Sequence, residues 1–199
     1  MTRISGFSTE KLLELHQFQY DGSHRNPNEC GLCSMAMLLE IGARKSGADV
    51  HVNALEFGLE IDRIPFRFPR FPAWFPGPGG ATHPFAALWG MQRKIGKLRR
   101  EGNDMPWRAV LRFRQTEQQL ETEIAQGNPT LIYGVGRTGI PHVVVPIGRD
   151  GNIWKILDPA FARERNPRQW SQPVLMDWWK NFGLLYPRGT MISLKPLVQ

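Results

Sequence analysis

The chain of 199 residues contains only two cysteines, Cys30 and Cys33, which lie three positions apart. Two thiols are too few for a disulfide framework, and without further ligands they make no zinc site. The five histidines show no spacing typical of metal ligands. The sequence therefore predicts no metal and no cofactor. It also predicts a core that is stabilised by packing alone, which a chain of this length allows.

Long apolar runs are lacking as well. No stretch approaches the roughly 20 apolar residues of a membrane span, so no span is expected. The first seven residues have no apolar stretch of the kind that a signal peptide needs. We therefore expect a cytoplasmic protein, unless an export leader has been removed. The hydrophobic content of 41% is ordinary for a globular chain, so disorder is not predicted.

Positive charge is abundant and concentrated in one segment. The formal net charge is +7, yet residues 63–114 hold eleven Lys or Arg against two acidic residues, a net of +9 that leaves −2 for the rest. Such a segment either binds an acidic partner or nucleic acid, or forms a solvated surface. No aromatic-interleaved RNA motif or recognition-helix pattern accompanies the charge. Nucleic acid is therefore not the expected partner, whereas an acidic partner stays open.

Residues 64–80, inside the basic segment, hold five prolines, four phenylalanines and Trp74. Because proline lacks the amide donor, this run cannot form regular secondary structure. Its aromatic content argues against a disordered linker, so we expect it to pack on the protein. Two placements stay open for Pro65–Gly80. It either lies over a groove beside Cys30 and shapes substrate access, or covers the core elsewhere.

Periodicity and turn residues predict the secondary structure. Helices are expected over 29–41, 84–100, 116–126 and 173–182, and strands over 130–135, 142–147, 153–157 and 190–194. Residues 9–20 fit either a short helix or an extended segment. The helix over 29–41 is apolar nearly all round, which predicts a central, buried helix that ends at Gly42. Helices that come first and strands that follow predict an α+β fold with an antiparallel sheet.

Three residues lie where an acyl-transfer enzyme needs them. Cys30 opens the apolar helix, His142 starts a strand, and Asp158 closes the next strand. The thiolate is the nucleophile of cysteine enzymes, and both a helix N-terminus and a neighbouring imidazolium favour it. Cys30 would have both. Cys33 lies one turn further into an apolar interior, where cysteine behaves as a small apolar residue.

A hairpin would bring His142 and Asp158 together. If a five-residue loop over 148–152 pairs Ile147 with Ile153, then His142 lies opposite Asp158, with Cβ atoms ~5 Å apart on one face. The carboxylate could then accept the Nδ1 proton of the imidazole and hold its tautomer. A slip of one residue would break this arrangement. The sequence therefore predicts a nucleophile, a base and an orienting carboxylate at one site.

The stretch NECGLCSMAMLL resembles the nucleophile helix of papain-like cysteine peptidases, and most of all the bacteriocin-processing (double-glycine leader) peptidases and their standalone relatives. The stretch PHVVVPIGRDGNIWKILDPA resembles their histidine strand and the Asp-Pro strand after it. The resemblance covers roughly residues 12–42 and 115–195. It implies a papain-like fold, with a helical lobe that carries the nucleophile helix packed on an antiparallel sheet. Residues 1–199 would then form a single domain with an insertion at about 63–114.

The resemblance implies that Cys30 is the nucleophile, His142 the base and Asp158 the orienting residue. One ambiguity concerns the cysteine. Papain itself carries Cys-Gly-x-Cys with the second cysteine catalytic, which would favour Cys33. The bacteriocin-type family uses the cysteine before the glycine, and the position at the helix start also favours Cys30.

A second ambiguity concerns the oxyanion. The family uses a glutamine upstream of the cysteine, whose side-chain amide helps to hold the oxyanion. That glutamine commonly lies six residues before the cysteine, where this chain has His24. Gln19 is the preferred candidate, which requires the loop 21–27 to be an insertion. Gln17 and Asn28 are the alternatives, and Asn28 could equally be the N-cap of the helix.

The predicted function is that of a cysteine peptidase or a related thiol acyl-transfer enzyme acting on a peptide, protein or amide substrate. A double-glycine leader as substrate follows from the resemblance alone. One alternative is a papain-like binding module that has lost catalysis and acts through its basic lobe. The other is a thiol–disulfide redox protein using Cys30 and Cys33, which would need an apolar strand just before the motif. Residues 26–29 supply no such strand.

Overall fold

The computed structural model describes residues 2–4, 6–20, 30–62, 82–136, 139, 141–180 and 187–197. Within them, helices and an antiparallel sheet form an α+β fold, as predicted. The strands are β1 (Thr2–Arg3), β2 (Trp107–Arg112), β3 (Thr130–Val135), β4 (Pro141–Asp150), β5 (Ile153–Leu157), β6 (Arg168–Ser171) and β7 (Met191–Pro196). The seven-stranded sheet has the order β2-β7-β3-β4-β5-β6, and β1 pairs with the end of β4 that is nearer to β5 in sequence.

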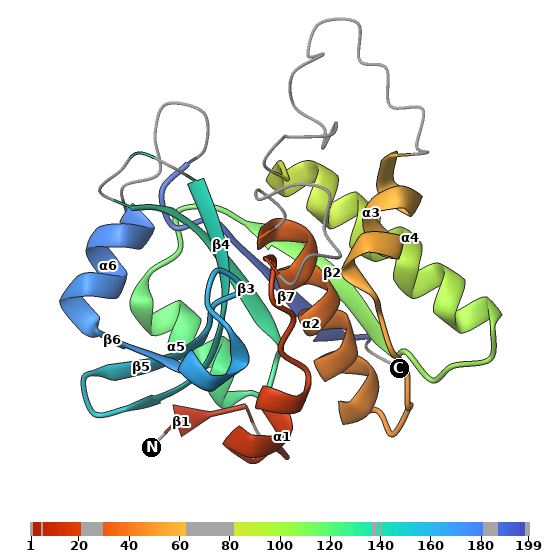
Figure 1. The fold of residues 1–199 in the computed structure, drawn as a ribbon, viewed down its shortest axis with the longest axis horizontal. Helices are drawn as coiled ribbons and strands as arrows, with labels where there is room; N and C mark the ends of the chain where they lie inside the picture. The colour runs from red at the N-terminus through yellow and green to blue at the C-terminus, as the bar shows by residue number, and fades with distance from the viewer. Residues whose placement is uncertain are drawn as a thin grey trace, which may run out of the picture.

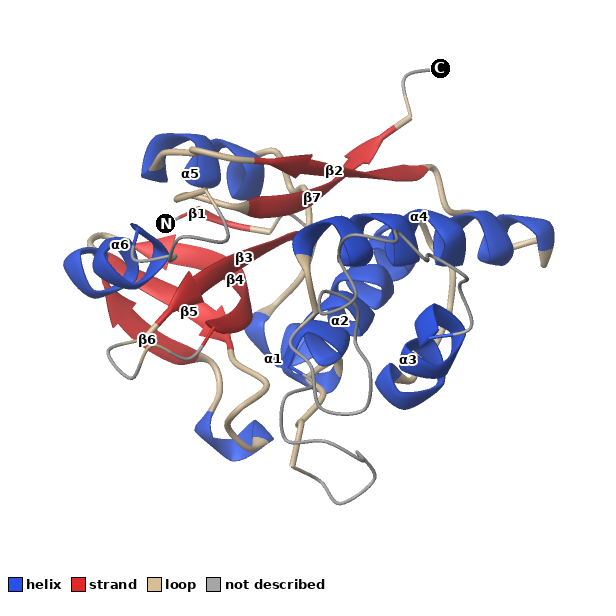
Figure 2. Ribbon diagram, turned by 90° about the horizontal axis from the view of Figure 1, so that it is seen from above, coloured by secondary structure: helices blue, strands red, loops and turns tan. Residues whose placement is uncertain are grey.

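The helices are α1 (Thr9–Glu14), α2 (Cys30–Lys45), α3 (Ala54–Asp62), α4 (Pro84–Arg100), α5 (Glu117–Ala125) and α6 (Gln172–Lys180), with a 3-10 turn at Arg163–Arg165. Figure 2 shows α1 to α4 gathered on one side of the sheet, while α5 and α6 lie toward the other. Helix α2 lies between the sheet and the helices α3 and α4 (Figure 1). The result is a helical lobe packed on a sheet, which agrees with the expected papain-like arrangement.

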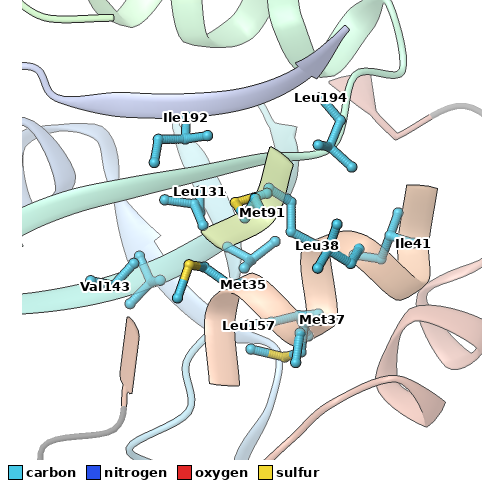
Figure 3. Close-up of a cluster of buried hydrophobic side chains, with 14 of the residues drawn as sticks. Met35, Met37, Leu38, Ile41, Met91, Leu131, Val143, Leu157, Ile192 and Leu194 are labelled. Atoms are coloured by element: carbon cyan, nitrogen blue, oxygen red, sulfur yellow. The ribbon is translucent and has the colours of Figure 1, made fainter. Parts of the chain in front are cut away.

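The core centres on α2, whose residues from Cys30 to Ala43 are all buried. Figure 3 shows Met35 and Leu38 of this helix in one cluster with Leu131, Val143 and Ile192 of the sheet. Burying each such side chain stabilises the fold by about 1.5–3 kcal/mol. The prediction of a central helix that is buried all round is confirmed, and this burial holds the helix start against the sheet.

The sequence predicts that α2 ends at Gly42, and this prediction is wrong. The helix continues through Gly42 to Lys45. The glycine serves a close approach instead. A Cβ at Gly42 would lie 2.7 Å from a methyl carbon of Leu194 and 3.5 Å from the Trp107 ring. The Trp107 Nε1 donates a hydrogen bond to the Gly42 carbonyl oxygen at 2.8 Å. Gly42 therefore lets β2 and β7 pack closely on the helix.

Most predicted elements agree with the structure, and α4, β3 and β5 have the predicted bounds. The ambiguous segment 9–20 begins as the short helix α1, where the Ser8 side chain accepts a hydrogen bond from the Lys11 backbone N at 3.3 Å. The sequence analysis misses β1, β2 and β6. Strand β2 pairs with β7 along all its six residues.

The basic segment 63–114 contributes directly to this fold. Its helix α4 packs on α2 and on β2, and β2 lies at one end of the sheet order. The organisation as a single domain and the status of 63–114 as an insertion stay predictions. The predicted groove cover, Pro65–Gly80, lies outside the described residues. In the part of the chain that the structure describes, no helix has the length and apolarity needed to cross a membrane.

Candidate active site

Cys30 is the first residue of α2 and is 5% exposed, whereas Cys33 is completely buried one turn further along the helix. Neither cysteine forms a disulfide. The Ser34 hydroxyl, on the residue directly after Cys33, donates to the Val143 backbone oxygen at 3.0 Å. Because Val143 follows His142 directly, this bond ties the cysteine helix to the histidine strand.

The hairpin that carries His142 differs from the predicted one. Asp150 pairs with Ile153 across a two-residue turn, so the predicted five-residue loop over 148–152 is wrong. The turn can be this short because it begins at Gly151, whose φ of 55° lies in the left-handed region that glycine adopts readily.

A shift in register between Pro146 and Gly148 decides which face His142 occupies. Next to the turn, the observed pairing is shifted by three residues from the predicted register. A shift by an odd number of residues would turn the paired side chains to opposite faces of the sheet. Beyond the bulge the difference is two residues, because Val145 pairs with Leu157. Side chains alternate with a period of two, so His142 and Asp158 lie on the same face as diagonal neighbours.

The structure brings Cys30, His142 and Asp158 together. His142 Nε2 lies 2.7 Å from Asp158 Oδ1, and the histidine also forms a side-chain hydrogen bond with Cys30. The carboxylate therefore contacts Nε2, not the predicted Nδ1. The contact between Nε2 and Asp158 leaves Nδ1 for the sulfur.

The surroundings of His142 favour its protonated form. Burial alone would lower the pKa of His142, but its hydrogen bonds with Asp158 and Cys30, and the charges of these two residues, raise it to about 10. Only 19% of the histidine side chain and 3% of the aspartate side chain are exposed, so water screens the pair weakly. An imidazolium between a carboxylate and a sulfur is the environment that favours a thiolate.

Asn166 is a residue of this site that the sequence analysis misses. It is buried, and its Oδ1 accepts a hydrogen bond from the Asp158 backbone N at 2.8 Å. His16 also approaches, with its Nε2 3.1 Å from the Asp158 backbone oxygen. No motif marks Asn166 in the sequence. Its position eight residues after Asp158, just before Pro167, was the available signal, because Asn-Pro typically starts a turn.

The candidate oxyanion residues differ in their contacts. Gln17 uses both ends of its side-chain amide away from the site, since Nε2 donates to the Val52 oxygen at 2.7 Å and Oε1 accepts from the Ala54 N at 3.1 Å. Gln19 is buried, and its backbone N donates to the oxygen of Pro159, the residue after Asp158. These contacts favour Gln19 over Gln17. Asn28 lies outside the described residues.

Two glycines let other elements approach the site. A Cβ at Gly31, next to Cys30, would lie 2.7 Å from the Cβ and Oγ1 of Thr82. Gly134 is the strand partner of His142, and a Cβ there would lie 2.5 Å from the Trp178 ring. The indole of Trp178 therefore packs beside the histidine, on the face that opposed side chains share. Within the described ranges, no group of three or more His, Cys, Asp or Glu could hold a metal ion.

Comparison with known proteins gives structural matches only. No protein-family model matches the sequence, and no curated protein resembles it in sequence. A C39-like peptidase candidate from Bacillus anthracis matches with a TM-score of 0.62 and 15% identity, over 100% of this chain and 98% of that one. The peptidase domain of Streptococcus ComA, a bifunctional ABC transporter involved in quorum sensing, matches with a TM-score of 0.52 and 16% identity, over 90% of this chain and 96% of that one.

Both matches agree with the resemblance that the cysteine helix and the histidine strand predict. At this level of identity they establish the fold and leave the chemistry to the site itself. From its helical lobe, its antiparallel sheet and these neighbours, the chain has the papain-like fold of the C39-like peptidases.

Proposed function

We propose that the chain is a cysteine peptidase or a related thiol acyl-transfer enzyme that acts on a peptide or protein substrate. The observation that carries the proposal is the double contact of His142, which bonds to Cys30 and lies 2.7 Å from Asp158. A cysteine, an imidazole and an orienting carboxylate in hydrogen-bond contact are the groups that covalent acyl transfer requires.

In the proposed mechanism, the Cys30 thiolate attacks the carbonyl carbon of the scissile amide. The imidazolium of His142 donates its Nδ1 proton to the leaving amine, and a thioester with Cys30 remains. Water then attacks this thioester after giving a proton to the same nitrogen, and the thiolate leaves. Throughout, Asp158 accepts a hydrogen bond from the Nε2–H of His142, which holds the ring in one orientation and stabilises its charge.

Gln19 is the proposed donor to the oxyanion that forms during the attack. Its side chain is buried beside the turn that follows Asp158, and Gln17 is engaged elsewhere. A preorganised donor of this kind is worth about 10²–10³-fold in rate. An acidic partner, which the basic segment leaves open, is not supported and is not part of the proposal.

Alkylation with iodoacetamide across pH, followed by peptide mapping, tests the first half of the proposal. Cys30 should react readily, and its reaction should slow in His142→Ala, because the imidazole that contacts the sulfur is then removed. The fully buried Cys33 is the internal control and should react slowly. Preferential labelling of Cys33, or the same pH profile in His142→Ala as in the wild type, would count against the assignment.

Hydrolysis of a diverse peptide library, read by mass spectrometry, tests the second half. Cleavage that disappears in Cys30→Ala supports a peptidase. A reactive Cys30 without any cleavage or acyl transfer would instead favour the alternative of a papain-like binding module that has lost catalysis.

A further inference from the structure

Asp158 lies just beyond the last residues of β5 that form backbone hydrogen bonds with β6. The ladder between β5 and β6 has Ile156 paired with Arg168 as its inner pair, and β5 itself ends at Leu157. Asp158 is nevertheless only 2% exposed. A buried backbone N–H and C=O require hydrogen-bond partners, so something other than the ladder must supply them at this residue.

Asn166 supplies them with its side chain. Its Oδ1 accepts from the Asp158 backbone N at 2.8 Å, and its Nδ2 lies 3.3 Å from the Asp158 backbone oxygen. If the β5–β6 register continued by two residues, Asp158 and Asn166 would be direct partners. A side-chain amide carries the same donor and acceptor groups as a peptide unit. Asn166 therefore takes the place of one further rung of the sheet.

The backbone cannot make this rung itself. The Asn166 backbone N donates to the Arg163 oxygen at 3.0 Å, at the end of the 3-10 turn. The next residue, Pro167, has no N–H to offer to a ladder. Within the loop, the Asp158 backbone oxygen also accepts a hydrogen bond from the Phe161 backbone N at 3.1 Å. The Asn166 side chain adds the contact to the Asp158 backbone N.

The amide is itself held firmly. Its Nδ2 lies 2.9 Å from the Phe161 oxygen and 3.1 Å from both the Ala162 oxygen and His16 Nε2. Burial lowers the pKa of His16 and outweighs its contact with the Asp158 backbone, which keeps the ring neutral. With Asn166 only 8% exposed, these partners leave the amide one orientation.

The orientation of the Asp158 backbone determines where its carboxylate points. Oδ1 accepts from the Ala160 backbone N at 3.0 Å and lies 2.7 Å from His142 Nε2. Both the Ala160 amide and the Asp158 backbone belong to the loop that Asn166 closes. A shift of this loop would therefore move the carboxylate away from the imidazole.

We propose that Asn166 is a positioning residue, which holds the Asp158 carboxylate on His142 by replacing a missing rung of the sheet with its side-chain amide. This inference rests on the proposed function, because it assigns Asn166 to the site of that reaction. Asn166 touches neither the cysteine nor a substrate in this role and acts through Asp158.

A purely structural role is the competing explanation, and Asn128 is a matched control for it. Asn128 is also buried, and its Nδ2 donates to Glu123 Oε2 at 3.0 Å and to Gln126 Oε1 at 3.1 Å. Neither of these contacts involves His142 or Asp158. Asn128→Ala therefore removes a comparable hydrogen-bonded amide without touching the triad.

The experiment is an NMR titration of the His142 Hε1 proton in the full chain, assigned with His142→Gln. Asn166→Ala should move the His142 titration toward lower pH by about one unit or more, because the opposite charge is no longer held beside the ring. The milder Asn166→Ser, whose hydroxyl cannot serve both backbone groups at once, should give a smaller shift in the same direction. Asn128→Ala should leave the titration where it is in the wild type.

Alkylation of Cys30 at pH 6 gives a second readout, which should slow in the Asn166 variants and not in Asn128→Ala. An unchanged His142 titration in both Asn166 variants overturns the proposal, and so does an equal shift in Asn128→Ala. Neither readout depends on peptide cleavage. A shifted titration in a chain that cleaves no peptide would leave Asn166 as the positioning residue and remove the proposed peptidase activity instead.

Discussion

The two sides of the candidate site are held in place by different interactions. On the helical side, Cys30 starts a helix whose first 14 residues are all buried, so apolar packing determines where the sulfur lies. On the sheet side, His142 and Asp158 depend on hydrogen bonds, on a bulge in β4 and on the side chain of Asn166. On the helical side, the position of the sulfur depends on close packing that is distributed over many contacts. The sheet side depends on a few directional ones.

This difference explains which features of the molecule respond to a single substitution. Removing one contact from the packing of α2 leaves many others. Changing the register of β4, or losing the amide of Asn166, should instead displace His142 or Asp158 as a whole. The substitutions below change residues on one side of the site, or the Ser34 hydrogen bond that joins the two sides.

The largest effect is expected from the reacting residues themselves. Cys30→Ala should abolish activity, and His142→Ala should lose about 10²–10⁴-fold or more, because both take part in bond making or proton transfer. Asp158→Asn should cost less, since it removes only orientation and charge. The measurement is the rate of peptide cleavage or of acyl transfer. Full activity in Asp158→Asn would remove this residue from the site.

Gly134→Ala tests the sheet side without touching a reacting group. The new methyl would lie 2.5 Å from the rigid ring of Trp178, so we expect a loss of about 1–3 kcal/mol in the free energy of unfolding, with reduced activity. Urea denaturation measures it. The control is Gly96→Ala in α4, where the methyl would lie 3.6 Å from a nitrogen of the flexible Arg100 side chain. A larger loss in the control would contradict the packing argument.

Ser34→Ala tests the joint between the two sides. It removes the hydrogen bond from α2 to the Val143 oxygen and should cost about 0.5–1.5 kcal/mol. Activity should fall beyond what this loss explains, because the distance between Cys30 and His142 is no longer held. Ser193→Ala is the control, since this serine is also buried and bonds to Thr130 in the sheet. Equal activity in the two variants would show that the joint is merely structural.

The pH dependence of stability distinguishes the contributions of Cys30 and Asp158 to the raised pKa of His142. The pKa of this residue rises from its ordinary value of 6.5 to about 10 on folding. Its contribution to stability is therefore complete below pH 6.5 and disappears as the pH rises through 10. Relative to His142→Gln, the wild type should lose stability between these values. In Cys30→Ala and in Asp158→Asn the loss should begin at lower pH, and an unchanged curve in either variant would exclude that residue as a cause.

Local patterns were enough to predict several elements of this fold. The capping box at Thr116 and Gln119 predicts α5, and both of its hydrogen bonds are present. The apolar residues of α2 predict its burial correctly. The prediction that Gly42 ends the helix was wrong, because the close approach of Leu194 to Gly42 cannot be seen from residues near Gly42 in the sequence. The strand β2 was missed for a similar reason, since its partner β7 lies about 80 residues further along the chain.

The sequence by itself determined the chemical groups and the element that carries each one: a cysteine at a helix start, a histidine at a strand start and an aspartate at a strand end. These are local features, which depend on residues close together in the chain. Only the tertiary structure decided that His142 meets Asp158 through Nε2, because a two-residue turn and a bulge set the register between β4 and β5. Only the tertiary structure brought Asn166 to Asp158 as well. Register and loop closure depend on the total energy of many distant contacts, and no single motif encodes that sum.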